Sequence, residues 1–130
     1  MIRVLLVDDE ESVLQLEQEI LSGHGLEVKA ARSTWEAIDI LKSEVVDVAV
    51  IDLEMSGEVS TFGLFNWIEQ NHPELAPRVI FTSSNVQDQA ANDIIRKFSC
   101  SVLMKPFQID EFWNALRKVL ASEVTLPLKH

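Results

Sequence analysis

The sequence predicts an α/β domain in which a five-stranded parallel sheet is doubly wound by helices, as a (βα)5 unit. Short apolar runs recur at intervals of roughly twenty to thirty residues, and amphipathic segments separate them. Runs such as VLLV and VAVI are apolar on consecutive residues, which is typical of parallel strands covered on both faces. Strands that alternate with helices imply right-handed crossovers and a helix layer on each side of the sheet.

The predicted strands cover residues 2–7, 26–31, 45–51, 78–81 and 101–104. The second run, LEVKAA, is more polar than the others, so we expect it at an edge of the sheet.

The predicted helices cover residues 12–24, 33–41, 61–70, 85–98 and 109–121. In the first, Val13, Leu16 and Ile20 recur at helical spacing and are expected to form the buried stripe. In the second, Ser33 followed three residues later by Glu36 matches a capping box.

Composition limits the function. The 130 residues are enough for one domain with one good core, and we expect that domain to end at residue 122, with residues 123–130 as a tail or the start of a linker. A formal net charge of −10 would repel nucleic acids and anionic membranes, so this chain is not expected to bind DNA directly. The charge favours basic protein partners or a bound cation. The lack of a membrane-length apolar run or signal peptide, with Cys100 as the single cysteine, predicts a cytoplasmic protein.

Polar side chains gather where the predicted strands end. They are Asp8, Asp9 and Glu10 after the first strand, Asp52 after the third, Thr82, Ser83 and Ser84 after the fourth, and Lys105 with Pro106 after the fifth. In such a sheet the carboxyl ends of the strands form one functional edge. Two carboxylates about 4 Å apart repel by about 4 kcal/mol at an effective dielectric of 20, so a cation is expected among them. Ligands that are all oxygen favour Mg²⁺. Lys105 and Thr82 could then contact phosphoryl oxygens, which leaves one carboxylate to act as the nucleophile.

Four ordered motifs resemble those of the receiver domains of two-component response regulators: VDDE at 7–10, Asp52, FTSS at 81–84 and KPF at 105–107. The resemblance spans nearly the whole chain and implies the flavodoxin-like, CheY-like strand order 2-1-3-4-5. It implies that Asp52 accepts a phosphoryl group from a phosphohistidine, and that Mg²⁺ is held by Asp8, Asp9, Asp52 and the backbone carbonyl of Glu54. It further implies that Thr82 is the switch hydroxyl, that Lys105 pairs with the phosphoryl group, and that the Lys105–Pro106 peptide bond is cis.

The chain departs from the family pattern in three places. Ser56 stands where proline usually follows the methionine. In the stretch GEVSTFG at 57–63, the glycine that usually comes sooner in the pattern is delayed to Gly63, about three residues late, so the loop after Asp52 is longer. Val102 occupies the position of a switch aromatic, and a valine has few rotamers, so we expect the usual aromatic readout to be weakened or replaced. Glu54 and Ser84 hold positions that modulate phosphoryl lifetime in the family; Ser83 and Ser84 could equally be helix caps.

The resemblance implies a sensor histidine kinase or phosphotransfer protein as one partner and a downstream protein target or fused output domain as another. Dimerisation is common in the family, so a second copy of the chain is a third candidate. It implies a signalling domain that catalyses only its own phosphoryl transfer and hydrolysis. The alternative is a receiver-like docking module that phosphorylation does not regulate, and Mg²⁺-dependent labelling of Asp52 separates the two. A phosphohydrolase is disfavoured because Asp8 and Asp9 are consecutive and no segment could form a cap; a flavodoxin-like cofactor binder is disfavoured because no phosphate loop follows the first strand.

Overall fold

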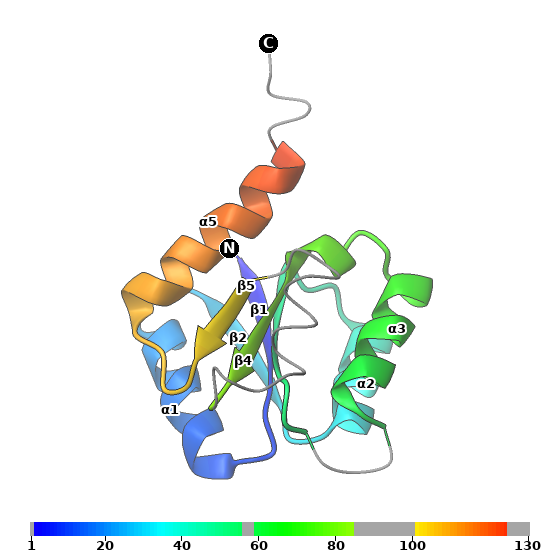
Figure 1. Cartoon of the computed structure of the whole chain (residues 1–130), viewed down its shortest axis with the longest axis horizontal. Helices are drawn as coiled ribbons and strands as arrows, with labels where there is room; N and C mark the ends of the chain where they lie inside the picture. Colours follow the sequence, from blue (N-terminus) through cyan, green and yellow to red (C-terminus); the bar gives the residue numbers. More distant parts are fainter. Residues whose placement is uncertain (1, 56–58, 85–100, 125–130) are drawn as a thin grey trace.

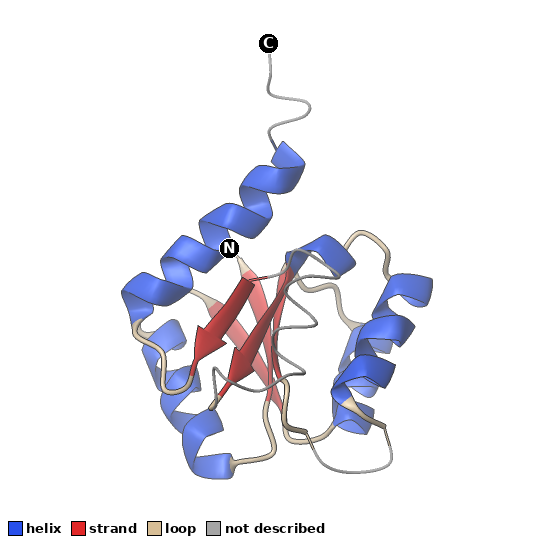
Figure 2. Cartoon of the chain, viewed as in Figure 1, coloured by secondary structure: helices blue, strands red, loops and turns tan. Residues whose placement is uncertain are grey.

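The computed structural model describes residues 2–55, 59–84 and 101–124. Five parallel strands form one sheet in the order β2-β1-β3-β4-β5, which confirms the predicted fold class and the edge position of the second strand. Figure 2 shows the sheet with helices on both sides. The strands are β1 (Arg3–Val7), β2 (Glu27–Ala31), β3 (Val48–Asp52), β4 (Val79–Ser83) and β5 (Ser101–Met104).

The described helices lie in two layers, one on each face of the sheet (Figure 1). They are α1 (Glu11–Ser22), α2 (Thr34–Ser43), α3 (Thr61–Asn71), the short 3-10 helix η1 (Ala76–Arg78) and α5 (Ile109–Val124). α1 and α5 cover one face, while α2 and α3 cover the other. The helix predicted for residues 85–98 falls outside the described residues.

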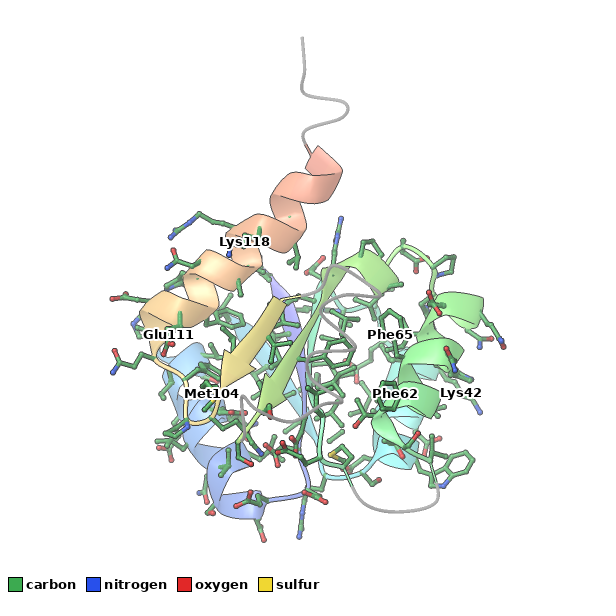
Figure 3. The ribbon with its side chains drawn as sticks, in the orientation of Figure 1. Lys42, Phe62, Phe65, Met104, Glu111 and Lys118 are labelled. Atoms are coloured by element: carbon green, nitrogen blue, oxygen red, sulfur yellow. The ribbon has the colours of Figure 1, made fainter. Side chains whose placement is uncertain are left out.

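Each face of the sheet has its own apolar core, because successive side chains of a strand point to opposite faces. In β3, Val48 and Val50 belong to the core beneath α1 and α5, whereas Ala49 and Ile51 belong to the core beneath α2 and α3. We call these the α1/α5 core and the α2/α3 core. In the latter, Phe65 lies between α3 and the sheet, with its ring centroid 5.7 Å from that of Phe81, while Lys42 and Lys118 lie on the outside of the molecule (Figure 3).

Two strands begin and end later than predicted. β3 begins at Val48 rather than at Val45, which is 78% exposed. The residue before the strand, Asp47, accepts a hydrogen bond of 2.8 Å from the backbone N–H of Arg3. At the other end, Asp52 belongs to β3, and Thr82 and Ser83 belong to β4. The polar residues at this edge are therefore held by the ladder itself rather than by the loops that follow.

The starts of α2 and α3 are set by short local hydrogen bonds. The Ser33 hydroxyl accepts from the backbone N–H of Glu36 at 3.0 Å, as the capping box predicts. The Glu36 carboxylate, however, accepts from the N–H of Arg32 at 2.6 Å, so the reciprocal half of the box is displaced by one residue. Ser60 caps α3 in the same way, accepting from the N–H of Gly63 at 3.0 Å.

The predicted buried face of α1 was wrong. The helix buries Leu14, Glu17 and Leu21, while Leu16, expected in the core, is 46% exposed. The buried residues have the same helical spacing as the predicted ones, but the middle residue is a glutamate. Glutamate is rarely buried, so the sequence pattern did not indicate this face.

Glu17 is only 3% exposed, and among the residues that the structure describes its Oε2 has no hydrogen-bond partner. Desolvation by burial, followed by the charge of Asp8, raises the pKa of Glu17 from 4.5 to about 8. Glu17 is therefore protonated and uncharged at neutral pH. Because it ionises at lower pH in the unfolded chain, its contribution to stability is full below pH 4.5 and is lost as the pH rises to about 8.

Replacing Glu17 with leucine should remove this pH dependence. We expect the free energy of unfolding of the wild type to fall, relative to Glu17→Leu, by about 4 kcal/mol between pH 4.5 and pH 8.5. Urea denaturation across this range measures the difference. Glu19→Leu, at an exposed position of the same helix, is the matched control and should run parallel to the wild type. A parallel curve for Glu17→Leu would contradict the assignment.

Candidate functional site

Three polar side chains lie on one side of the sheet at its C-terminal edge because of strand alternation. Asp8 and Asp52 come two residues after Leu6 and Val50 of the α1/α5 core, so they continue on that face. Thr82 is paired with Asp52 in the β3–β4 register and follows the same rule. All three are 1% exposed. The sheet thus places two carboxyl groups and a hydroxyl in a largely desolvated pocket.

Lys105 follows the edge strand β5, and its side chain reaches past the end of β4 to these carboxyl groups. Its Nζ lies 3.2 Å from Asp8 Oδ2 and 3.2 Å from Asp52 Oδ2, and 3.8 Å from Glu10 Oε1. The Lys105 side chain is 5% exposed, so its ammonium group is compensated chiefly by these acids. Asp9 adds a third carboxylate, and ligand atoms of Asp8, Asp9 and Asp52 lie within 4.8 Å of one another.

The charges in this pocket shift one another's titration. Burial raises the pKa of Asp52 to about 6 and the charge of Asp8 adds to the rise, while the Glu54 N–H and Lys105 limit it. Burial alone would lower the pKa of Lys105, but the charges of Asp52 and Asp8 raise it above its ordinary value. Lys105 is therefore a permanent cation at neutral pH.

Backbone groups fix the orientation of both buried carboxylates. Asp8 Oδ1 accepts from the N–H of Glu10 at 2.9 Å, and Asp52 Oδ1 accepts from the N–H of Glu54 at 3.1 Å. Each acid then has its Oδ2 turned toward Lys105. The hydroxyl of Thr61, at the start of α3, donates to the backbone carbonyl of Asp52 at 2.6 Å and holds the strand end from behind.

Glu54 links the ends of β3 and β4, an arrangement that the sequence did not predict. Its carboxylate accepts from Ser83 Oγ at 2.7 Å, from the N–H of Ser84 at 3.1 Å and from Ser84 Oγ at 2.9 Å. Partial burial acts to raise the pKa of Glu54, but the bonds from Ser83 and Ser84 hold it below its ordinary value. A fixed negative charge therefore stands at this edge. Whether the two serines also cap a following helix concerns residues outside the described range.

The end of β5 carries the remaining predicted residues. The N–H of Lys105 donates to the carbonyl of Ser83 at 2.9 Å, and the Lys105–Pro106 peptide bond is cis, as the resemblance implied. Val102 pairs with Phe81 in the β4–β5 register and is half-buried against the α2/α3 core. Val102 and the acidic pocket thus lie on opposite faces of the sheet.

The donor set suits a hard divalent cation. The candidate ligands Asp8, Asp9 and Asp52 offer only carboxylate oxygens, without a nitrogen or sulfur donor among them. The single compensating charge of Lys105 leaves this group of acids with an excess of negative charge, which such a cation would balance.

The strand order and the acidic edge define the class of doubly wound α/β domain that binds its ligands beyond the carboxyl ends of the strands. A family model described as the response regulator receiver domain matches residues 4–117, so the chain belongs to that family and is a receiver domain of two-component response regulators.

Relatives and solved structures agree with this assignment. A putative NtrX-like response regulator of Rickettsia felis is 31% identical over 94% of this chain and 25% of its own length. The DNA-binding transcriptional regulator NtrC of Klebsiella pneumoniae is 34% identical over 82% of this chain and 22% of its own length. The response regulator TrrA of Thermotoga maritima, solved in complex with Mg²⁺ and BeF, is 25% identical, with a TM-score of 0.77 over 92% of this chain and 99% of that one.

The chain spans a quarter or less of the length of these two curated relatives. Within the part of the chain that the structure describes, no helix has both the length and the apolar character needed to cross a bilayer.

Removing the Lys105 ammonium should destabilise the domain. In Lys105→Met, Asp8 and Asp52 would remain buried beside each other without their cation, and we expect the free energy of unfolding at pH 7.5 to fall by about 2–4 kcal/mol. Urea denaturation in buffer without divalent cations measures this loss. Lys42→Met, an exposed lysine of α2, should change stability little, and equal effects of the two substitutions would contradict the role of Lys105.

Proposed function

We propose that Asp52 accepts a phosphoryl group from the phosphohistidine of a sensor histidine kinase or of a phosphotransfer protein, in a reaction that depends on Mg²⁺. The observation that carries this proposal is the position of Asp52: its Oδ2 lies 3.2 Å from a buried ammonium, within a cluster of three carboxylates. Asp8, Asp9 and Asp52 would hold the cation, together with the backbone carbonyl of Glu54.

The phosphoryl transfer from histidine to aspartate needs no reactant besides the two side chains and Mg²⁺. A carboxylate oxygen of Asp52 forms a bond to phosphorus, the bond from phosphorus to the imidazole nitrogen breaks, and its electron pair stays on the ring. Lys105, whose Nζ lies 3.2 Å from Asp52 Oδ2, would contact a phosphoryl oxygen, and the hydroxyl of Thr82, which is paired with Asp52 in the strand register, would donate to another. When bound, Mg²⁺ would offset the charge shared by the carboxylates and the phosphoryl oxygens. Water attack on the acyl phosphate later returns Asp52 to its free form.

The signal would leave through protein contacts. A phosphoryl group on Asp52 would compete with the carboxylates for the Lys105 ammonium and would accept a hydrogen bond from the Thr82 hydroxyl. The end of β4 and the connection after β5 would therefore be the first parts of the chain to move. Val102, half-buried and small, supports an output that does not use the rotation of an aromatic side chain. Ser83 and Ser84 would act in this response through their bonds to Glu54, and Pro106 is structural.

The receiver would act on a downstream target or on a fused output domain. The greater length of the relatives supports a fused output domain, which would begin after a tail or linker at residues 123–130. One of these relatives, NtrC, is a DNA-binding transcriptional regulator by name. With a net charge of −10, the receiver itself is not expected to contact DNA. A cytoplasmic location and a homodimer in the phosphorylated state complete the proposal.

Labelling should depend on both Asp52 and Mg²⁺. After incubation with acetyl phosphate and Mg²⁺, we expect the intact mass of the wild type to increase by one phosphoryl group. The increase should be absent without Mg²⁺ and in Asp52→Asn, and should persist in Asp39→Asn, which alters an exposed carboxylate of α2. If neither acetyl phosphate nor a panel of phosphorylated histidine phosphotransfer domains labels the wild type, the docking module becomes the better description.

Glu54 should slow the approach of anionic phosphodonors. Its carboxylate stands beside the pocket, so Glu54→Gln should raise the rate of labelling by acetyl phosphate, by about threefold to tenfold at low ionic strength. A time course of intact mass measures the rate, and added salt should reduce the difference. Glu69→Gln, on the exposed side of α3, controls for net charge. A rate at or below that of the wild type would show that the bonds to Ser83 and Ser84 matter more than the charge.

A further inference from the structure

The buried carboxyl group of α1 lies on the same side of the sheet as the acidic pocket. Leu14 and Leu21, one helical turn before and after Glu17, are both members of the α1/α5 core. Asp8, Asp52 and Thr82 continue the strands that floor this core. Glu17 is therefore buried within the body of the domain, on the face of the sheet that carries the pocket.

The charged groups that act on Glu17 are those of the pocket itself. They come from three elements: Asp8 from the end of β1, Asp52 from the end of β3, and Lys105 from the connection after β5. Asp9 and Glu10 stand in the turn between β1 and α1, and Glu10 also lies near Lys105. The other elements that border this core present apolar groups to it: β2 gives Val28 and Ala30, and α5 gives Phe112, Ala115, Leu116 and Val119.

The proposed phosphotransfer does not use Glu17, yet a buried carboxyl oxygen that finds no partner among the described residues is costly to keep. A leucine would fill the same stripe without that cost. We propose that Glu17 is a proton-linked regulator of the acidic cluster: it is uncharged in the free domain and releases its proton when a divalent cation binds beside Asp8 and Asp52. This inference rests on the proposed binding of Mg²⁺ and extends it to a residue outside the ligand set.

The coupling follows from charge alone. A dication in the pocket favours the ionised form of a nearby buried carboxyl group, so it lowers the pKa of Glu17. By linkage, ionised Glu17 must strengthen cation binding by the same factor. Through a partly desolvated interior we expect a shift of about one pH unit, which corresponds to about a tenfold change in affinity. The receiver would then bind its cation more tightly as the pH rises toward 9, through a group that does not touch the ion.

The first arm of the test observes the proton on the wild type. The ¹³C chemical shift of the Glu17 carboxyl carbon, followed from pH 4 to pH 9, should titrate near 8 in the free domain and about one unit lower in saturating Mg²⁺. Titration near 4.5 in the free domain, or a midpoint that Mg²⁺ leaves in place, would overturn the proposal. This arm needs no substitution, so a variant that folds poorly cannot obscure it.

The second arm observes the cation by isothermal titration calorimetry with Mg²⁺ alone, between pH 6.5 and pH 9. We expect the affinity of the wild type to rise over this range by about tenfold more than that of Glu17→Gln. Glu19→Gln, which removes an exposed carboxylate from the same helix, should follow the wild type, and all three proteins keep the three proposed ligands. Equal pH dependence in Glu17→Gln would overturn this inference but leave Mg²⁺ binding intact, whereas failure of Mg²⁺ to bind at any pH would overturn both.

Discussion

The contact of Lys105 with Asp8 and Asp52 is the interaction on which this domain depends. A parallel sheet brings the carboxyl ends of its strands together, so acids that follow β1 and β3 must meet at one edge. Lys105 follows β5, which β4 separates from β3, and so its ammonium group reaches across the sheet to equidistant oxygens of both acids. This ammonium group thereby connects the first strand of the fold to the last, but its single charge does not neutralise the three carboxylates, so a metal ion still has a charge to balance.

Burial makes the electrostatic interactions among these few charges strong. Helices cover both faces of the sheet, so the pocket adjoins the α1/α5 core and its buried side chains are largely removed from water. Interactions between charges strengthen in such surroundings, and the raised pKa values of Asp52 and Glu17 both have burial as their largest cause. The apolar residues that fold the sheet are thus also the ones that set how strongly its acidic groups respond to one another.

Through the family resemblance, the sequence implied the strand order. It was sufficient by itself for the alternation of strands and helices, the two helix layers and the residues that meet at the edge, because each depends on strong local patterns and on a general rule for parallel sheets. It failed where tertiary context overrides residue type. Glu17 was not among the residues expected in the core, although Leu14 and Leu21, seven positions apart, mark its face of the helix. The link from Glu54 to Ser83 joins two strand ends, and no local pattern encodes such a contact.

The loop that follows Asp52 has two fixed points. The Thr61 hydroxyl returns to the carbonyl of Asp52, and the hydroxyl of Thr34, at the start of α2, donates to the carbonyl of Val59 at 2.8 Å. Between such anchors the entropy of closure grows only slowly with added residues. A longer connection at this point therefore costs little in stability, and the two hydroxyl groups hold the described ends of the loop beside the site whatever its length.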